Sequence, residues 1–341
     1  MVSTQQLGES QMAASRSGPR YYAASVSGQM TRWDTYFWWL LLMLLWPWPS
    51  MAAPLGVYQG NGCTGVKQLD KFVEWFGQKP DIALDFFAPD SWESMTNDAV
   101  WAMECWKKAA IPIVFSLPML PKGAYTLTEG SVGSYDEAFV RLAKAMVEHG
   151  YGSAIVRIGW EFNGGWFVWA AKRDPVSWKA YWRRVVTAMR SVPGAKFRFD
   201  WCSTEGENQI RPDSVYPGDD VVDIIGMDVY NQTWDKNVST PQQRWSELLD
   251  QPYGLKWQRD FARAHNKPMS FPEWGTGTRP DGHGGGDDPN FVEEMAKWIA
   301  DNNVAYQSYW DYPASDYNAR LSDGHQPLAG SAYQKAFGPK P

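Results

Sequence analysis

The sequence predicts a single domain with an α/β fold, a (β/α)8 TIM barrel, on the basis of three observations. Short apolar segments alternate with segments of helical periodicity from Leu55 to Phe337, which is typical of parallel strands joined by helices. The chain has 341 residues, 44% of them apolar, and one barrel of ~250 residues plus extensions fits that length. Two apolar segments also end at a glutamate beside a tryptophan, in Trp160-Glu161 and Glu273-Trp274, each leading into a Gly-rich loop.

Eight apolar segments are expected to form the strands of the barrel. The third is almost continuously apolar, as a strand buried on both faces should be. In chain order the predicted strands are Leu55–Tyr58, Ile82–Phe87, Ile111–Leu117, Ala154–Ile158, Lys196–Cys202, Val222–Tyr230, Lys267–Phe271 and Ala305–Trp310.

The segments between these strands carry the apolar periodicity and the end signals of helices. Ser134 opens one of them as an N-terminal cap, Gly150 ends it, and Pro175 begins the next. The predicted helices are Val66–Phe76, Asn97–Ala110, Ala138–His149, Val176–Ser191, one or two helices within Pro241–His265, Phe291–Asn302 and Leu328–Phe337, with Gly123–Ser134 as a loop.

The first 52 residues are expected to lie outside the barrel. Residues 1–29 are rich in Ser, Gln and Gly without periodicity, which indicates a disordered or untranslated leader. In residues 30–52 the apolar run Tyr36–Trp46 is short for a spanning helix of ~20 residues, and Ser50 and Ala52 fit a cleavage site. We therefore expect a signal peptide over 30–52 and a secreted or periplasmic catalytic domain over 53–341. An uncleaved membrane anchor is the alternative.

Charge and aromatic content favour a carbohydrate partner. The formal net charge is −6 and no basic stripe is present, which argues against a nucleic-acid partner. Twenty-one tryptophans suggest exposed aromatic platforms in addition to core residues, and flat aromatic rings suit the apolar faces of sugars. We expect a polysaccharide as the partner, with no nucleic acid, no membrane contact after signal cleavage, and a monomeric protein.

The cysteines and histidines do not form a recognisable site. Cys63, Cys105 and Cys202 cannot all pair and lack C-x-x-C spacing, so we expect neither a zinc site nor a disulfide. The four histidines are scattered, and Asp287-Asp288 lacks the ligand spacing of an EF-hand. The sequence predicts no metal and no required cofactor.

Glu161 and Glu273 are the predicted catalytic residues. Each follows a buried strand, where a carboxylate is costly to desolvate unless it is used. Strands four and seven lie across the mouth of a barrel, so the two carboxylates could flank one glycosidic bond. One would protonate the leaving oxygen and the other would attack the anomeric carbon. A buried ion pair of Glu161 with Arg157 is the structural alternative for Glu161.

Three motifs resemble glycoside hydrolase family 26, the β-mannanase family, in the clan of retaining barrel glycosidases with catalytic glutamates on strands four and seven. They are Arg157-Ile158-Gly159-Trp160-Glu161-Phe162-Asn163-Gly164-Gly165-Trp166, Gly226-Met227-Asp228-Val229-Tyr230-Asn231 and Pro272-Glu273-Trp274-Gly275. The resemblance implies that Glu161 is the acid/base and Glu273 the nucleophile. It also implies that Tyr230 hydrogen-bonds the nucleophile and that Trp166 and Trp310 pack against the sugar.

The remaining predicted substrate-binding residues are Trp274, Trp160, Asn163 and Asp228. For the tryptophans the alternative is a place in the core, and for Asp228 it is structural hydrogen bonding.

The chain departs from the mannanases at two positions. They usually carry histidine immediately before the acid/base and at the end of strand three, where this chain has Trp160 and Ser116-Leu117-Pro118. The expected function is therefore a retaining endo-β-glycanase acting on β-mannan, β-glucan, β-1,3-xylan or a bacterial exopolysaccharide. A transglycosylase in exopolysaccharide processing and a non-catalytic carbohydrate-binding barrel are the alternatives. The Gly-rich loop Gly275–Asn290 is expected to be a lid or a site that tolerates insertion.

Overall fold

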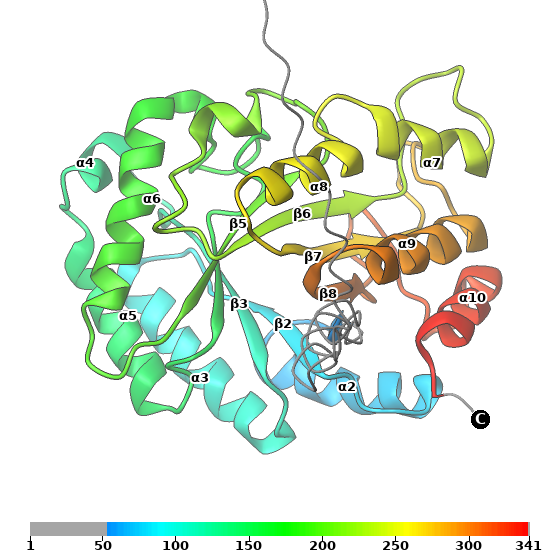
Figure 1. Ribbon diagram of the computed structural model, residues 1–341. Coiled ribbons are helices and arrows are strands. Elements are labelled where there is room, and N and C mark those ends of the chain that lie inside the picture. Colours follow the sequence, from blue (N-terminus) through cyan, green and yellow to red (C-terminus); the bar gives the residue numbers. More distant parts are fainter. Residues whose placement is uncertain (1–52, 340–341) are drawn as a thin grey trace, which may run out of the picture. The chain divides into compact units, whose positions relative to one another are not determined.

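A closed barrel of eight parallel strands lies at the centre of the computed structural model, which describes residues 53–339 (Figure 1). Each strand pairs with the next along the chain, and the eighth pairs with the first. The predicted (β/α)8 fold is therefore confirmed. The strands are β1 (Leu55–Tyr58), β2 (Ile82–Phe86), β3 (Ile113–Leu117), β4 (Ile155–Ile158), β5 (Arg198–Thr204), β6 (Ile224–Tyr230), β7 (Met269–Gly275) and β8 (Val304–Trp310). The predicted leader and signal peptide lie outside the described residues.

Helices surround the barrel and bury an apolar face against it (Figure 1). Large side chains such as Phe72, Trp106, Trp182 and Tyr333 are fully buried in this layer. The α-helices are α2 (Gly62–Phe76), α3 (Trp92–Ala109), α4 (Leu127–Ser131), α5 (Asp136–Glu148), α6 (Pro175–Arg190), α7 (Pro241–Asp250), α8 (Leu255–Ala264), α9 (Pro289–Asp301) and α10 (Pro327–Phe337), and the short 3-10 helices are η1 (Ala171–Arg173) and η2 (Pro212–Val215).

The predicted loop Gly123–Ser134 contains the short helix α4, so this part of the sequence prediction is wrong. A capping box explains why the helix forms. The Thr126 side chain accepts a hydrogen bond from the backbone N–H of Glu129, and the Glu129 carboxylate accepts one from the backbone N–H of Thr126.

Strand β7 contains a bulge that positions Glu273. Between Phe271 and Trp274 the strand advances three residues while β8 advances two, so one extra residue lies on β7. Pro272 falls within this interval and has no N–H to donate to the sheet. The bulge thus re-aims the end of β7, where Glu273 and Trp274 point to opposite sides of the barrel wall.

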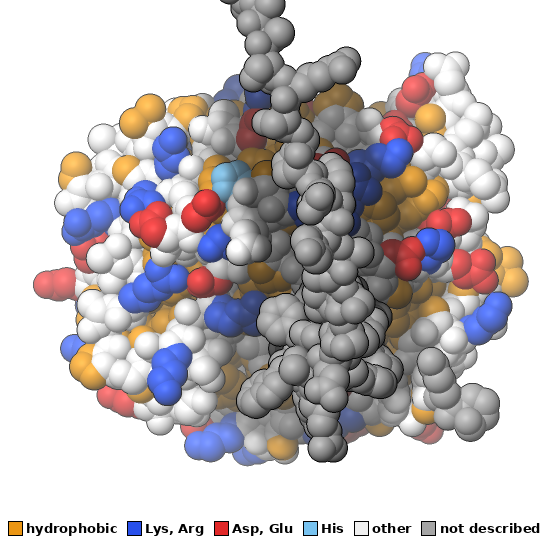
Figure 2. All heavy atoms as spheres, in the orientation of Figure 1, with side chains coloured by type: hydrophobic (Ala, Val, Ile, Leu, Met, Phe, Trp, Pro, Cys, Tyr) orange, Lys and Arg blue, Asp and Glu red, His pale blue; other side chains and the backbone are white. Residues whose placement is uncertain are grey.

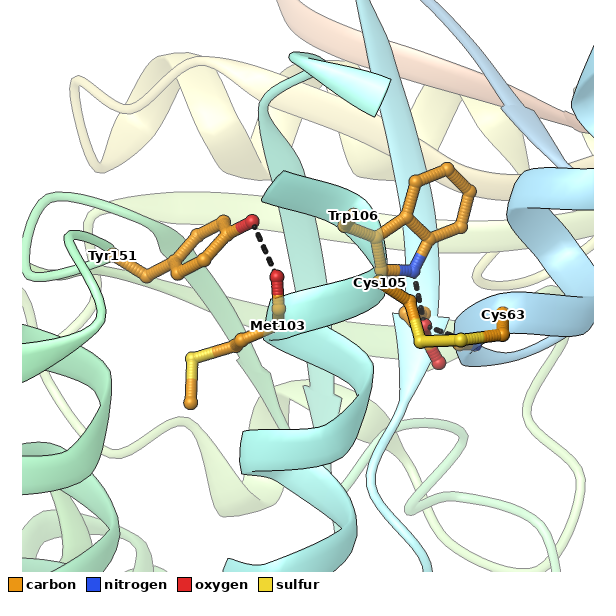
Figure 3. Close-up of a disulfide and its surroundings, with 7 residues drawn as sticks. Cys63, Met103, Cys105, Trp106 and Tyr151 are labelled. Atoms are coloured by element: carbon orange, nitrogen blue, oxygen red, sulfur yellow. Dashed lines mark hydrogen bonds between the residues drawn. A yellow bond between two sulfur atoms is a disulfide. The ribbon is translucent and has the colours of Figure 1, made fainter. Parts of the chain in front are cut away.

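A disulfide joins Cys63 near the start of α2 to Cys105 near the end of α3, so the prediction of no disulfide is wrong (Figure 3). The Asp85 carboxylate on β2 connects the two segments that carry the cysteines. It accepts a hydrogen bond from the backbone N–H of Gly62 at 2.7 Å and another from the indole N–H of Trp106. These bonds bring the residues next to both cysteines to one point, although the cysteines are 42 positions apart in the sequence.

The surface in Figure 2 carries Lys and Arg side chains interspersed with Asp and Glu side chains. None of the helices within residues 53–339 combines the length and the apolar character needed to span a membrane.

Candidate active site

A cleft of about 900 Å³ opens at the carboxyl ends of the strands. Its walls come from the ends of β2, β4, β5, β6, β7 and β8 and from the loops that follow them. Its lining includes Phe86, Trp160, Glu161, Trp166, Glu205, Tyr230, Gln232, Trp234, Glu273, Arg279, Trp310 and Tyr317. Both glutamates predicted as catalytic therefore face the same cleft.

Glu161 sits on a strained turn directly after β4. Its φ is 50°, a left-handed conformation that is uncommon outside glycine and that concentrates at functional sites. The backbone N–H of Glu161 donates to the carbonyl of Cys202 on β5 at 2.9 Å, which holds the turn against the barrel. The Trp166 indole N–H donates to Glu161 Oε2 at 2.7 Å.

Glu273 is 6% exposed and both of its carboxylate oxygens accept hydrogen bonds. Arg157 Nη2 donates to Oε1 at 2.5 Å, and the Tyr230 hydroxyl donates to Oε2 at 2.7 Å. The same Arg157 nitrogen also donates to Asp228 at 2.8 Å. The alternative reading of Arg157 as a partner of Glu161 is wrong, because the side chain reaches across the barrel interior to β6 and β7.

The electrostatic environments of the two glutamates differ. Burial, and then the negative charge of Glu273, raises the pKa of Glu161 to about 8. The neighbouring guanidinium of Arg157 and the indole of Trp166 oppose this shift. Glu273, in contrast, has a cation and a phenol in direct contact with its oxygens. The cleft therefore holds one carboxyl group whose pKa is raised to about 8 and a second whose two oxygens both accept hydrogen bonds.

Three predicted tryptophans line the cleft to different extents. Trp166 is 56% exposed beside Glu161. Trp310, at the end of β8, stacks on Tyr58 with ring centroids 4.1 Å apart. Trp160 is mostly buried among other aromatic rings, and its remaining surface faces the cleft.

Three residues predicted to bind substrate do not line the cleft. Trp274 is fully buried on the outer side of β7, where its indole N–H donates to Gln307 and its ring packs near Phe291 and Tyr333. Asn163 is buried and bonds Thr204 and Gly206, so it ties the loops after β4 and β5 together. Asp228 is buried against Arg157 and accepts from the backbone N–H of Glu273.

Further cleft residues were not among the predicted site residues. Glu205, directly after β5, accepts hydrogen bonds from Thr204 and Gln232, and burial raises its pKa to about 7. Gln232 accepts from Arg279. Trp234 is 57% exposed on the loop after β6. Glu205 follows the end of β5 as Glu161 follows the end of β4, and this position is the signal that would have identified it.

The loop Gly275–Asn290 is tied to its neighbours, which does not fit the expectation of a mobile lid. Gln232 and Gly284 form an isolated bridge, and so do Thr278 and Asn318. Asp287 accepts from the backbone at the start of α10, and Asp288 caps α9. Within residues 53–339 no group of three or more His, Cys, Asp or Glu side chains is arranged to hold a metal ion.

Comparison with known proteins shows similarity to one family of carbohydrate-active enzymes. The model of "Glycosyl hydrolase family 26" matches residues 124–250. A mannan endo-1,4-beta-mannosidase of Bifidobacterium adolescentis is 28% identical over an alignment of 200 residues, and the match covers 52% of this chain. The match spans only 18% of that relative's length.

Solved structures share the fold. The catalytic domain of a Bacillus sp. JAMB-750 GH26 endo-β-1,4-mannanase aligns with a TM-score of 0.57 and 19% identity, covering 83% of this chain and 86% of its own. A GH26 β-mannanase from Bacteroides ovatus aligns with a TM-score of 0.55 and 17% identity, covering 84% and 88%. The family model covers β4 with Glu161 and β6 with Tyr230. The predicted resemblance of this chain to glycoside hydrolase family 26 is therefore confirmed.

Proposed function

We propose that this protein is a glycoside hydrolase that cleaves a β-linked polysaccharide internally and retains the anomeric configuration. The observation that carries the proposal is the pair Glu161 and Glu273 in one cleft, with opposite environments. Retaining glycosidases need one protonated and one ionised carboxyl group on either side of the bond. The match to glycoside hydrolase family 26 supports the reaction class.

The reaction proposed for this cleft has two displacement steps. Glu273 attacks the anomeric carbon while the Glu161 carboxyl group gives its proton to the leaving oxygen, which forms a covalent glycosyl-enzyme and releases the first sugar product. Glu161, now ionised, then removes a proton from water as the water attacks the same carbon and frees Glu273. Tyr230 and Arg157 hold the Glu273 oxygens for the attack.

β-1,4-Mannan is the first substrate to test, because the curated relative is a mannan endo-1,4-beta-mannosidase. β-Glucan, β-1,3-xylan and bacterial exopolysaccharides are the alternatives, because Trp160 and Ser116 stand where the mannanases usually carry histidines.

We further propose that the protein acts in an oxidising compartment, outside the cytoplasm, after removal of residues 30–52 as a signal peptide. The disulfide Cys63–Cys105 supports this location, because stable disulfides are rare in the reducing cytosol. N-terminal sequencing of the exported protein tests the cleavage, and a mature chain that begins well before Ala53 would contradict it.

Release of reducing ends from β-mannan, mixed-linkage β-glucan, β-1,3-xylan and exopolysaccharides by the purified protein tests the reaction. We expect turnover of one polymer by the wild type and a loss of at least about a thousandfold in Glu273→Ala. NMR of the first product should show the β-anomer before mutarotation. Turnover that survives in Glu273→Ala, or α-anomer as the first product, would refute the mechanism.

A further inference from the structure

The cleft extends beyond the two glutamates into a group of side chains that the proposed reaction does not use. This group comes from the loops after β5, β6 and β7 and consists of Glu205, Gln232, Trp234 and Arg279, supported by Asp281 and His283. We propose that it forms a sugar-binding subsite for the leaving-group side of an uncharged glycan. The inference rests on the proposed function and deepens it.

Trp234 has the properties of a platform for a sugar ring. It lines the cleft and is 57% exposed, although aromatic rings of this size normally bury most of their surface. His283 stacks near it with ring centroids 5.3 Å apart, and the Arg279 guanidinium lies 5.3 Å from its ring. The exposed ring is thus held in place before a ligand arrives, which lowers the entropic cost of binding.

Hydrogen bonds between two loops fix the base of this platform. The backbone N–H of Thr233 donates to the carbonyl of His283 at 3.1 Å, and His283 Nδ1 lies 2.8 Å from the carbonyl of Thr233. The bridge between Gln232 and Gly284 continues the same contact. Trp234 therefore directly follows a segment that is bonded to the loop after β7, and does not lie at the tip of a free loop.

A chain of polar side chains connects the platform to Glu205. Arg279 Nη1 donates to Gln232 Oε1 at 3.0 Å, and Gln232 Nε2 donates to Glu205 Oε1 at 3.2 Å. Glu205 also accepts from the Thr204 hydroxyl at 2.9 Å. Each carboxylate oxygen can accept a second hydrogen bond, so Glu205 can take a sugar hydroxyl without losing these partners.

The charges of the subsite suit hydroxyl groups and oppose a carboxylate on the ligand. Among the described residues that line the cleft, seven are acidic and Arg279 is the single base. Asp281 already holds the Arg279 guanidinium with two bonds, from Nε at 3.0 Å and from Nη2 at 2.8 Å. Arg279 is therefore neutralised by its own neighbour, and the ligand chemistry that fits is a sugar without a carboxylate.

The order of the strands assigns the subsite to the leaving-group side. Glu161 on the β4 side and Glu273 on the β7 side divide the barrel mouth into two halves. Trp310, stacked on Tyr58, belongs to the half that contains β8 and β1. Glu205 and Trp234 belong to the other half. A glycan that packs its attacked sugar on Trp310 and passes between the glutamates continues over the half that holds Trp234.

Turnover of two probes by the full-length protein tests this assignment. Trp234→Ala should lower kcat/KM on mannohexaose about tenfold, the usual value of one aromatic stacking contact. It should leave kcat/KM unchanged on 4-nitrophenyl β-mannotrioside, whose leaving group places no sugar in the subsite. Trp101→Ala is the matched control, because Trp101 is 50% exposed and does not line the cleft. Equal losses on the two probes, or no loss on mannohexaose, would overturn the subsite.

Binding to Glu273→Ala by calorimetry separates the subsite from catalysis. Mannohexaose, cellohexaose and laminarihexaose are the neutral probes, and cellohexaose oxidised to carboxylates at C6 is the charged one. We expect at least one neutral probe to bind, Trp234→Ala to weaken it about tenfold, and the oxidised probe to bind at least tenfold more weakly than cellohexaose. Binding of no neutral probe, or equal binding of the oxidised one, would overturn the inference. Binding as expected without polymer turnover by the wild type would refute the proposed reaction and leave the subsite standing.

Discussion

Replacing Trp166 with phenylalanine should move the alkaline limit of activity, the pH at which kcat/KM falls on the alkaline side, to a higher value. Glu161 has to be protonated to act as the acid, and burial raises its pKa to about 8. Activity should thus be present below this pH and fall as the pH rises through about 8. The Trp166 indole donates to the ionised form of Glu161 at 2.7 Å and so stabilises the state that is inactive as an acid.

The size of the shift follows from the strength of one hydrogen bond. A bond to a charged group contributes about 1.5 kcal/mol at the low end, which suits an indole that is 56% exposed. One pKa unit corresponds to about 1.4 kcal/mol. Trp166→Phe should therefore move the alkaline limit upward by about one pH unit.

The assay is the dependence of kcat/KM on pH between pH 5 and pH 10, on the polymer that the wild type cleaves. Trp101→Phe, outside the cleft, should behave as the wild type does. An alkaline limit below pH 6 in the wild type would show that Glu161 is not the acid. An unmoved limit in Trp166→Phe would show that the indole does not stabilise the ionised form of Glu161.

Three further predictions concern stability. Glu161→Gln should raise the free energy of unfolding by up to about 3 kcal/mol at pH 7 and leave it nearly unchanged at pH 4. The raised pKa of Glu161 stabilises the fold at low pH, and this contribution is lost as the pH rises from 4.5 to about 8. Equal urea midpoints of the variant and the wild type at pH 7 would contradict this prediction. Cys63→Ala with Cys105→Ala should lower the free energy of unfolding by about 4 kcal/mol, worked from the 42-position separation, and Tm by about 7 °C. Calorimetry with and without reductant measures this change, and the Tm of the variant should not respond to reductant. Arg157→Met should cost about 3 to 5 kcal/mol in urea unfolding, because it leaves Asp228 and Glu273 buried without their cation; an unchanged urea midpoint would show that this ion pair does not stabilise the fold.

Strand positions were the most predictable part of the structure. A strand buried on both faces is apolar at most positions, so Ile113–Leu117 and Ile224–Tyr230, interrupted only by Ser116 and Asp228, stand out from their surroundings. The positions of Glu161 and Glu273 follow from the same reasoning, because a charged residue at the end of an apolar strand interrupts a pattern that packing alone would continue. These two residues therefore needed no long-range information.

Residues whose direction depends on local backbone geometry were harder to predict. Trp274 follows Glu273 on β7, and strict alternation would have placed it outward once Glu273 points inward. The sequence analysis instead predicts that Trp274 binds substrate, because it is next to Glu273 in the sequence. Glu161 is separated from Arg157 by a turn in which both Gly159 and Glu161 have positive φ, and no spacing rule for a regular strand describes such a turn.

The contact between Cys63 and Cys105 could not be inferred from the sequence. Cys63 and Cys105 lie 42 positions apart. They meet because the start of α2 lies beside the last turns of α3. The Asp85 carboxylate fixes this arrangement through Gly62 and Trp106. Cysteine spacing contains none of this information, since it depends on where two helices begin and end relative to a third element.

The position of Arg157 gives two identical side chains different surroundings. Its guanidinium lies inside the barrel against Glu273 and Asp228, which are both buried. Glu161 sits on the strained turn beyond the end of the same strand, outside hydrogen-bonding reach of that guanidinium, and has the weaker donor Trp166 instead. Burial, and then the charge of Glu273, raises the pKa of Glu161, and of the two glutamates only Glu273 has a cation in direct contact. A single buried arginine, placed nearer to one carboxyl group than to the other, therefore gives the two glutamates different electrostatic surroundings.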